Sequence, residues 1–411
     1  MTNDVQTISS YYESKLPAYL EMLRQMVAIN SFTDNPEGVN KLGELTVDFF
    51  QELNFNHRYV RCENPNFGKH LVFQSPKFNV NNSTIALISH LDTVFSAEDE
   101  LENDFQWRVS GERIYGPGTE DIKGGTVMIL MVLEGLKKFH PRIFDSVNWK
   151  IFLNAAEERL SPDFGRLCND MLPEDTKACL VFEAGTINKN GSTLVVSRKG
   201  RATFDVKVEG RAAHAGGSHE RGANAIVQMA HTIQTIAAFT DYAKEITFNP
   251  GRFEGGTVVN RVPHYAEAEV EMRAFDSEIF NEGIVKMLAL NGKSQVASQD
   301  GYACKVSIEI TEQTPPWAPN ASTQELFKLW SETAGSLGMN TIEEARGGLS
   351  DGNWTWERYP TLDGLGPTGA NPHCSERSPD GSKDQEYVLV PSFVPKALLN
   401  TTAILKLVEN I

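Results

Sequence analysis

Histidine and carboxylate side chains follow two apolar runs of the sequence, at the points where those runs end. His90 and Asp92 come directly after the run TIALIS (84–89), and Glu157 and Glu158 come shortly after the run VNWKIFL. Short apolar runs are typical of buried strands, and adjacent carboxylates at the end of a strand repel each other unless a positive charge binds them. The glutamate pair therefore predicts either a solvated loop, which is the simpler interpretation, or a metal site.

Two further acidic residues stand in comparable positions. Glu183 follows the apolar run ACLVF (178–182), and Asp121 lies in the loop YGPGTEDIKGG ahead of a helix that opens with glycines. In an open α/β sheet the carboxyl ends of the strands form the crevice in which sites are built, so these segments are expected to converge. The spacing of His90 and Asp92 turns both side chains to the same side of an extended segment, where the carboxylate can support a metal-binding imidazole.

Each of these residues also has a purely structural interpretation. His90 could be a buried histidine with a hydrogen-bond partner, and Asp121 could cap the helix that begins near Lys123. Taken together, however, imidazole and carboxylate donors at successive strand ends favour a metal site. A donor set without cysteine suits zinc, and cobalt or manganese less decisively.

Length and composition limit the class of protein. A chain of 411 residues exceeds the size at which one hydrophobic core keeps growing, which predicts two domains. The net charge of −16, without any run rich in lysine and arginine, argues against nucleic acid and anionic membranes as partners. We find no signal peptide, no apolar run long enough to span a bilayer, and five scattered cysteines without a CxxC pair. We therefore expect a cytoplasmic protein with reduced thiols.

The patterning of apolar residues changes along the chain. Strand-like runs alternate with helical patterns at first, which indicates an α/β domain with a mostly parallel sheet. Near residue 198 the pattern becomes that of strands with one solvated face, in the order βαββαβ of a ferredoxin-like unit. Its expected elements are strand 200–210, helix 222–239, strands 255–260 and 266–275, helix 277–291 and strand 302–311. We expect a catalytic domain formed by 1–198 and 313–411, with residues 199–312 inserted as a second domain.

Six segments of the chain resemble the signatures of a known family. The segments SHLDTVF, YGPGTEDIKGG, NAAEERLS, VFEAG, GRAAHAGG and GGLSDGN occur in the family's order. They are similar to those of the dinuclear-zinc metallopeptidases, which include glutamate carboxypeptidase, acetylornithine deacetylase and succinyl-diaminopimelate desuccinylase. The resemblance implies a phosphorylase/hydrolase-like catalytic domain, a ferredoxin-like lid through which the protein forms a homodimer, and two bound zinc ions.

The resemblance also implies a set of metal ligands. Asp121 would bridge the two zinc ions, His90 and Glu183 would complete one site, and Glu158 and His373 would complete the other. His373 is followed by the segment CSERSPDGSKDQ (374–385), which departs from the family's pattern. The departure leaves the local loop, and any role of the acidic residues within or just after it, open.

Other site residues are implied in the same way. Glu157 would be the general base and acid, Asp92 would orient His90, and His214 would reach the active site of the partner subunit to stabilise the oxyanion. Asn260 matches a position that contacts substrate.

Two arginines are candidate clamps for a substrate carboxylate, because a guanidinium donates two parallel hydrogen bonds. They are Arg273 in EMRAFD and Arg346 just ahead of GGLSD.

Three functions are compatible with these features. The first is a zinc-dependent exopeptidase that releases a C-terminal amino acid, and the position of Arg346 favours this glutamate carboxypeptidase-like reading. The second is an N-acyl-amino-acid deacylase, which uses the same chemistry on a different acyl group. The third is a non-catalytic scaffold, from which Glu157 or a ligand would be expected to be missing, and none is. A nicotinamide- or flavin-dependent oxidoreductase is disfavoured because the GxGxxG turn is absent.

Overall fold

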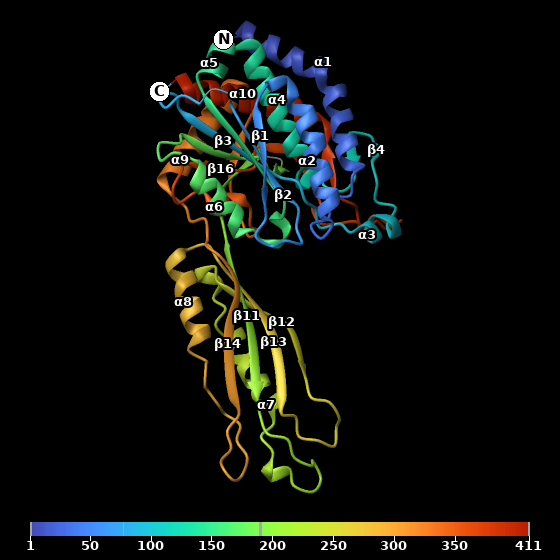
Figure 1. The fold of residues 1–411 in the computed structure, drawn as a ribbon, viewed down its shortest axis with the longest axis vertical. Coiled ribbons are helices and arrows are strands. Elements are labelled where there is room, and N and C mark those ends of the chain that lie inside the picture. Colours follow the sequence, from blue (N-terminus) through green and yellow to red (C-terminus); the bar gives the residue numbers. More distant parts are fainter. Residues whose placement is uncertain (1, 77, 189–190, 410–411) are drawn as a thin grey trace. The chain divides into compact units, whose positions relative to one another are not determined.

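The computed structural model describes residues 2–76, 78–188 and 191–409, and the chain divides into two compact units (Figure 1). Unit 1 comprises Met1–Val196, Pro319–Ala345 and Ser350–Ile411, and unit 2 comprises Ser197–Ala318 and Arg346–Leu349. The short segment Arg346–Leu349 joins unit 2 because the Arg198 guanidinium donates to the carbonyl oxygens of Gly348 and Leu349, at 3.1 and 2.9 Å. The fold is thus mixed α/β with an inserted second unit.

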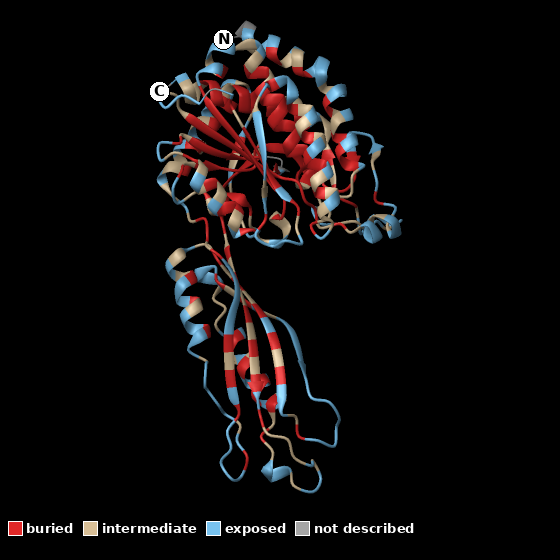
Figure 2. Cartoon of the chain, viewed as in Figure 1, coloured by how far each residue is buried: buried red, intermediate tan, exposed pale blue. Residues whose placement is uncertain are grey.

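Unit 1 is built on a six-stranded sheet in the order β1-β2-β6-β3-β7-β16. The strands are β1 (Asn56–Arg61), β2 (Lys69–Gln74), β3 (Thr84–His90), β6 (Asn148–Asn154), β7 (Ala178–Val181) and β16 (Thr361–Leu362). Strands β6, β3, β7 and β16 are parallel, whereas β2 runs antiparallel to β6 and β1 antiparallel to β2. Every residue of β3 and β6 is buried, as Figure 2 shows for the centre of this unit. Burial on both faces explains why these strands read as continuous apolar runs.

Helices cover both faces of this sheet. Side chains of β3 such as Leu87 pack with the larger group of helices, and those of alternate residues such as Ile88 pack against the opposite, smaller layer. The larger layer contains α1 (Thr2–Val27), α2 (Pro36–Phe50), α4 (Gly124–Phe139), α9 (Ala321–Ser336) and α10 (Phe393–Glu409). The smaller layer contains α6 (Pro162–Met171), whose Phe164 and Cys168 are fully buried.

Shorter elements complete unit 1. One sheet has the order β4-β5-β18-β17-β8 and another the order β15-β10-β9. Their strands are β4 (Arg108–Ser110), β5 (Arg113–Tyr115), β8 (Ala184–Gly185), β9 (Ile187–Asn188), β10 (Gly191–Arg198), β15 (Thr341–Arg346), β17 (Gly366–Ala370) and β18 (Tyr387–Leu389). The short helices are α3 (Ala97–Glu102) and α5 (Pro141–Asp145).

Unit 2 is a four-stranded antiparallel sheet in the order β12-β13-β11-β14, with two helices on one face. Its elements are β11 (Gly200–Glu209), α7 (Ala225–Ala237), β12 (Thr247–Gly255), β13 (Tyr265–Ala274), α8 (Ser277–Leu288) and β14 (Lys305–Thr314). Along β11 buried residues alternate with half-buried ones, because one face of the strand packs against the helices and the other does not. The chain order is βαββαβ, as the sequence predicts.

The second strand of unit 2 does not lie at 255–260, where the sequence analysis expects it. The strand β12 ends at Gly255, and the next glycine, Gly256, adopts a φ of +77°. Val258 and Val259 are exposed in the loop that follows. The sequence does not predict β12 because Pro250 interrupts the alternation of apolar and polar residues. The pairing with β13 shifts register next to that proline. A proline is tolerated there because β12 is an edge strand.

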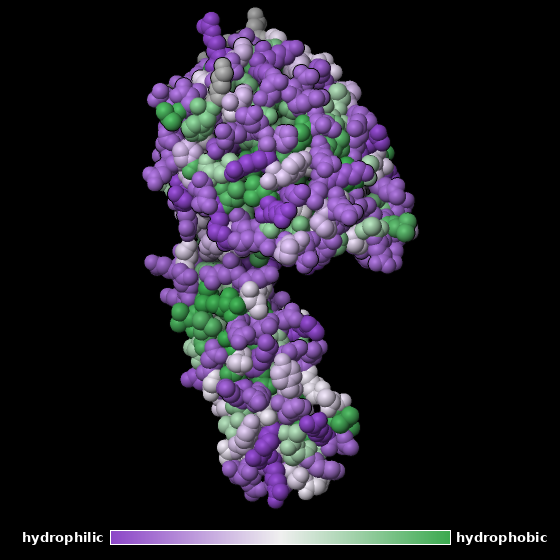
Figure 3. All heavy atoms as spheres, viewed as in Figure 1, coloured by the Kyte–Doolittle hydropathy of each residue, from purple (hydrophilic) through white to green (hydrophobic). Residues whose placement is uncertain are grey.

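In the view of Figure 3, hydrophilic side chains cover most of the visible surface of unit 1. Within residues 2–76, 78–188 and 191–409, no helix combines the length and apolarity that a membrane span requires.

Candidate metal centre

Three neighbouring parallel strands deliver ligand-type side chains to the same edge of the central sheet. His90 is the last residue of β3, Glu158 lies in the short turn after β6, and Glu183 follows β7. Because β6, β3 and β7 are adjacent and parallel, their carboxyl ends meet at one edge. The convergence that the sequence predicts for these residues is therefore a consequence of strand order.

Asp121 stands between two groups of potential ligands. One group is His90, Asp121 and Glu183, and the other is Asp121, Glu158 and His373; the ligand atoms within each group lie within 4.8 Å of one another. Asp121 Oδ1 is 2.9 Å from His90 Nε2, whereas Asp121 Oδ2 is 3.3 Å from His373 Nε2. The two oxygens of one carboxylate thus face different groups, which is the arrangement of a bridging ligand. His373 Nε2 is also 3.2 Å from Glu158 Oε2.

The backbone around Asp121 is held by a buried carboxylate from the end of the chain. Glu386 Oε1 accepts hydrogen bonds from the amides of Glu120 and Asp121, at 2.9 and 3.3 Å. Glu386 is completely buried. The Asp121 side chain makes no capping bond to α4, whose first residue is Gly124. Glu386 therefore orients the backbone from which the bridging carboxylate extends.

Asp92 lies beside His90, as their spacing predicts, and contacts it with both its main chain and its carboxylate. His90 Nδ1 is 2.9 Å from the backbone carbonyl oxygen of Asp92 and 3.4 Å from its carboxylate. The carboxylate also accepts from the amides of Glu157 and Glu158, at 3.0 and 3.2 Å, and from the hydroxyl of Thr33 at 2.7 Å. Asp92 therefore orients His90 chiefly through its main chain and anchors the glutamate loop through its side chain.

Burial and mutual repulsion dominate the electrostatics of the carboxylates. Burial raises the pKa of Glu157 well above its ordinary value, and the neighbouring carboxylates of Glu158 and Glu183 add to the effect. Burial and the charge of Asp121 raise the pKa of Glu158 to about 7. Burial acts on Asp121 in the same direction, but hydrogen bonds from His373 and His90 outweigh it and hold the pKa of Asp121 below its ordinary value.

The donor set fits divalent metal ions. Glu158 Oε1 is buried and has no hydrogen-bond partner, although its other oxygen faces His373. A buried carboxylate oxygen without a partner is costly, and a cation would satisfy it. Imidazole nitrogens and carboxylate oxygens are ligands that zinc accepts. The residues present can therefore hold a divalent metal ion at each of the two groups.

His373 is presented by a constrained loop. Both His373 and Asn371 adopt a φ of +64°. The segment that follows is tied to the surface of unit 1, since Arg377 pairs with Asp104 at 2.6 Å and Gln385 donates to the carbonyl oxygen of Asn103 at 2.9 Å. The residues after His373 thus hold this loop against the region around α3.

Unit 2 brings His214 and Asn260 together. The carbonyl oxygen of Asn260 accepts from the amide of Ala215 at 3.0 Å. His214 Nδ1 accepts from the amides of Gly216 and Gly217, both at 3.1 Å. A ring nitrogen that accepts from amides carries no proton, so the proton of the neutral His214 ring resides on Nε2. His214 is exposed, and its Nε2–H can donate to a substrate oxygen.

Both candidate arginine clamps belong to unit 2. Arg273 is engaged within this unit: Nε lies 2.7 Å and Nη2 3.1 Å from the carboxylate oxygens of Glu271, and Nη1 donates to the carbonyl oxygen of Gly347 at 2.7 Å. Arg346 is half-buried, and its carbonyl oxygen accepts from the amide of Lys199.

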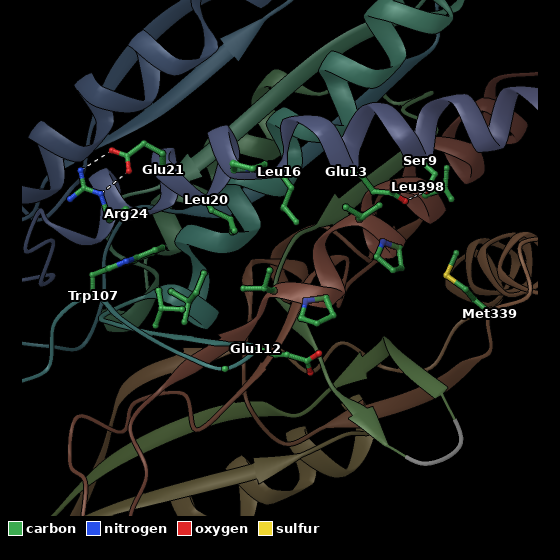
Figure 4. Close-up of a pocket in the computed structure, with 18 of the residues that line it drawn as sticks. Ser9, Glu13, Leu16, Leu20, Glu21, Arg24, Trp107, Glu112, Met339 and Leu398 are labelled. Atoms are coloured by element: carbon green, nitrogen blue, oxygen red, sulfur yellow. Dashed lines mark hydrogen bonds and ion pairs between the residues drawn. The ribbon is translucent and has the colours of Figure 1, made fainter.

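A cavity of about 890 Å³ lies elsewhere on unit 1. Figure 4 shows that α1 forms one wall of it, with the ion pair of Glu21 and Arg24 (2.7 Å) at one end and Leu398 and Met339 near the other. Its lining includes none of the predicted ligands.

The chain is similar to several known proteins. Residues 196–290 match the M20 peptidase dimerisation domain. Carboxypeptidase G2 of Pseudomonas sp. (strain RS-16) is 26% identical over 388 residues, which cover 93% of this chain and 87% of that protein. Acetylornithine deacetylase of Buchnera aphidicola (strain Tuc7) is 23% identical over 267 residues, covering 60% of this chain and 65% of that protein.

A solved structure shares the fold. The M20 family metallo-carboxypeptidase Sso-CP2 from Sulfolobus solfataricus superposes with a TM-score of 0.70 at 15% identity, covering 96% of this chain and 99% of that one. Residues 196–290 match a dimerisation domain, and the similarity to carboxypeptidase G2 extends over most of the chain. The chain is thus similar to M20 family metallohydrolases, which act on peptide or amide bonds.

Proposed function

We propose that the protein is a zinc-dependent exopeptidase that hydrolyses an amide bond and releases a C-terminal amino acid. The observation that carries the proposal is the pair of ligand groups that share Asp121, with Glu157 on the same turn as the ligand Glu158. The similarity to carboxypeptidase G2 over 93% of the chain favours a glutamate carboxypeptidase-like reaction.

In this proposal His90, Asp121 and Glu183 would hold one zinc ion, and Asp121, Glu158 and His373 would hold the other. Bound divalent ions would polarise a scissile carbonyl and lower the pKa of a water molecule. Glu157 accepts the proton of the attacking water and passes it to the leaving amine. Asp92 fixes the position of Glu157 through the hydrogen bond to its amide (3.0 Å), so that the carboxylate meets the water in a constant geometry.

Residues of unit 2 supply substrate contacts. His214 donates from Nε2 to the oxyanion, because its Nδ1 is already occupied by two amides. Asn260, whose backbone pairs with the neighbouring Ala215, contacts the substrate beside it. Arg346 binds the substrate carboxylate, whereas Arg273 would need to exchange its contact with Glu271 to do so.

We further propose a homodimer formed through unit 2, in which His214 acts in the active site of the partner subunit. The match of residues 196–290 to a dimerisation domain supports this arrangement. Two inactive variants, His214→Ala and Glu157→Ala, would then complement each other, because a mixed dimer contains one site with both residues intact. Activity recovered after the two variants are co-expressed supports the arrangement, and no recovery from a mixed dimer that has been isolated contradicts it.

The first test of the function is a survey of products. Zinc-loaded protein is incubated with dipeptides, glutamate-terminated amides such as folate, and N-acetyl and N-succinyl amino acids, and mass spectrometry detects the amino acids released. Release from peptides or glutamate amides by the wild type, but not by Glu157→Ala, supports the carboxypeptidase. Release from the N-acyl amino acids alone supports the alternative, an N-acyl-amino-acid deacylase, which the similarity to acetylornithine deacetylase also allows. A fully metallated protein that cleaves none of them contradicts both.

A further inference from the structure

The turn that carries Glu157 and Glu158 is a single 3-10 turn, Glu157–Arg159, and four successive amides at its start have side-chain acceptors. The amides of Glu157 and Glu158 donate to Asp92. The amide of Ala156 donates to Asn154 Oδ1 at 3.0 Å. The remaining amide, that of Ala155, donates to Nδ1 of His70 at 3.2 Å. His70 is not among the predicted metal ligands, catalytic residues or substrate-binding residues.

His70 is a buried residue of β2, 1% exposed, and its second nitrogen is held from another direction. Nε2 lies 3.1 Å from Asp163 Oδ2, and the same oxygen accepts from the amide of Glu63 at 2.8 Å. An amide can only donate, so Nδ1 must present its lone pair to Ala155 and Nε2 must carry the proton. Asp163, in the first turn of α6, accepts a hydrogen bond from this Nε2–H and so selects the tautomer that can bind Ala155.

The same residues do not form a third metal site, although Cys62, His70 and Asp163 lie within ligand distance of one another. A metal at Nε2 would require the proton to move to Nδ1, where it would face the amide hydrogen of Ala155. The Cys62 thiol lies 3.4 Å from Nε2, and burial together with the charges of Asp163 and Asp92 raises its pKa to about 12. Without a metal, Cys62 is therefore a neutral neighbour of the ring, and the amide at Nδ1 is the feature that argues against a metal at Nε2.

We propose that His70 and Asp163 are positioning residues: Asp163 fixes the tautomer of His70, and His70 fixes the start of the turn that presents Glu157 and Glu158. The chain from Asp163 through His70 to Ala155 ends two residues before the general base. A shift of this turn changes the distance over which Glu157 moves a proton without removing any ligand or substrate contact. The catalytic consequence rests on the proposed function, but the structural link does not.

Two substitutions separate the hydrogen bonds of His70. In His70→Asn the amide oxygen occupies the position of Nδ1 and can still accept from Ala155, but the contact to Asp163 is lost. In His70→Gln the terminal amide nitrogen reaches the position of Nε2 and can still donate to Asp163, but the acceptor for Ala155 is lost. Both variants remove the ring, which packs on Phe164 with a centroid distance of 5.2 Å, so their losses of packing are similar.

Three measurements on the zinc-loaded full chain test the proposal: kcat and KM, hydrogen exchange of a peptide spanning 154–160, and zinc content. We expect His70→Gln to lower kcat about tenfold or more with little change in KM, since a displacement near 1 Å costs up to about 100-fold. The amide hydrogens of the 154–160 peptide should exchange faster in His70→Gln than in the wild type. In His70→Asn, kcat should stay within a few fold of the wild type, and these amides should stay as protected as in the wild type. Zinc content should be the same in all three proteins.

Equal losses of kcat and equal exchange in the two variants would overturn the proposal, because they would point to packing of the ring. A zinc ion lost on either substitution would overturn it in favour of a metal at Cys62, His70 and Asp163. If the wild type cleaves no amide, the proposed function fails, whereas hydrogen exchange still decides whether His70 holds the turn.

Discussion

Replacement of Asp92 by asparagine tests how the turn after β6 is held. The carboxylate of Asp92 accepts from the amides of Glu157 and Glu158 with different oxygens, at 3.0 and 3.2 Å, and from the Thr33 hydroxyl at 2.7 Å. Asparagine is nearly the same size but has a single carbonyl oxygen. One of the two backbone amides must then face an NH₂ group, which cannot accept a hydrogen bond.

The expected loss of stability follows from the number of hydrogen-bond acceptors that the substitution removes. A hydrogen bond to a charged group contributes roughly 1.5–3 kcal/mol, and a buried donor without a partner costs about 1–3 kcal/mol. Because Asp92 is 1% exposed, water cannot replace the lost acceptor. We expect Asp92→Asn to lower the free energy of unfolding of unit 1 by about 2–4 kcal/mol, the two contributions being partly the same loss. The activity should fall by about 100-fold or more, since both glutamates shift with their turn.

Urea unfolding monitored by tryptophan fluorescence measures the first effect, because five of the six tryptophans belong to unit 1. All proteins are compared at the same excess of zinc, since bound metal adds to apparent stability. Thr33→Val is the matched control: it removes one hydroxyl from Asp92 but leaves both amide bonds, so about 1 kcal/mol is expected. An Asp92→Asn protein no less stable than Thr33→Val would refute the claim that the carboxylate anchors the turn.

Three further outcomes follow from the site. Glu157→Gln should lower kcat by about 100- to 10,000-fold, the range of a lost general base, with zinc content by plasma mass spectrometry unchanged; a variant that loses zinc would make Glu157 a ligand. His373→Ala should lower the zinc content from two ions to one, because His373 faces only the group that contains Glu158; loss of both ions, or of neither, would contradict separate groups sharing one aspartate. Removal of metal by a chelator should lower the melting temperature and zinc should restore it, because a metal ion that binds the folded state stabilises it and offsets the repulsion among the carboxylates of Asp121, Glu158 and Glu183; a melting temperature unaffected by the chelator would argue against metal at these groups.

The ligand-bearing ends of strands could be predicted because burial leaves a strong mark on sequence. Strands β3 and β6 are buried along their whole length, so their residues are mostly apolar on both faces, and the first ionisable side chains after the apolar runs mark their ends. Strand order then brings His90 and Glu158 to one edge. The edge strand β12 leaves no such mark, since most of its residues are exposed and Pro250 interrupts it. Apolar patterning therefore identifies the buried strands and the edge strand β14, and misses β12, which is mostly exposed and contains a proline.

The residues that hold the site in place could not be predicted in the same way, because a hydrogen-bond acceptor for a backbone amide has no sequence spacing. Thr33 reaches Asp92 across 59 positions, and His70 reaches Ala155 across 85. Each is a single polar residue in an otherwise ordinary segment, and only the packed fold shows its partner, which is a buried carboxylate for Thr33 and a buried amide for His70. The turn that carries the proposed base is a single 3-10 turn, so it cannot satisfy the amides at its start, and the fold must supply acceptors from elsewhere. Such acceptors are the places to look for residues that tune a site without touching its substrate, and the contrast between His70→Asn and His70→Gln tests that idea at one amide.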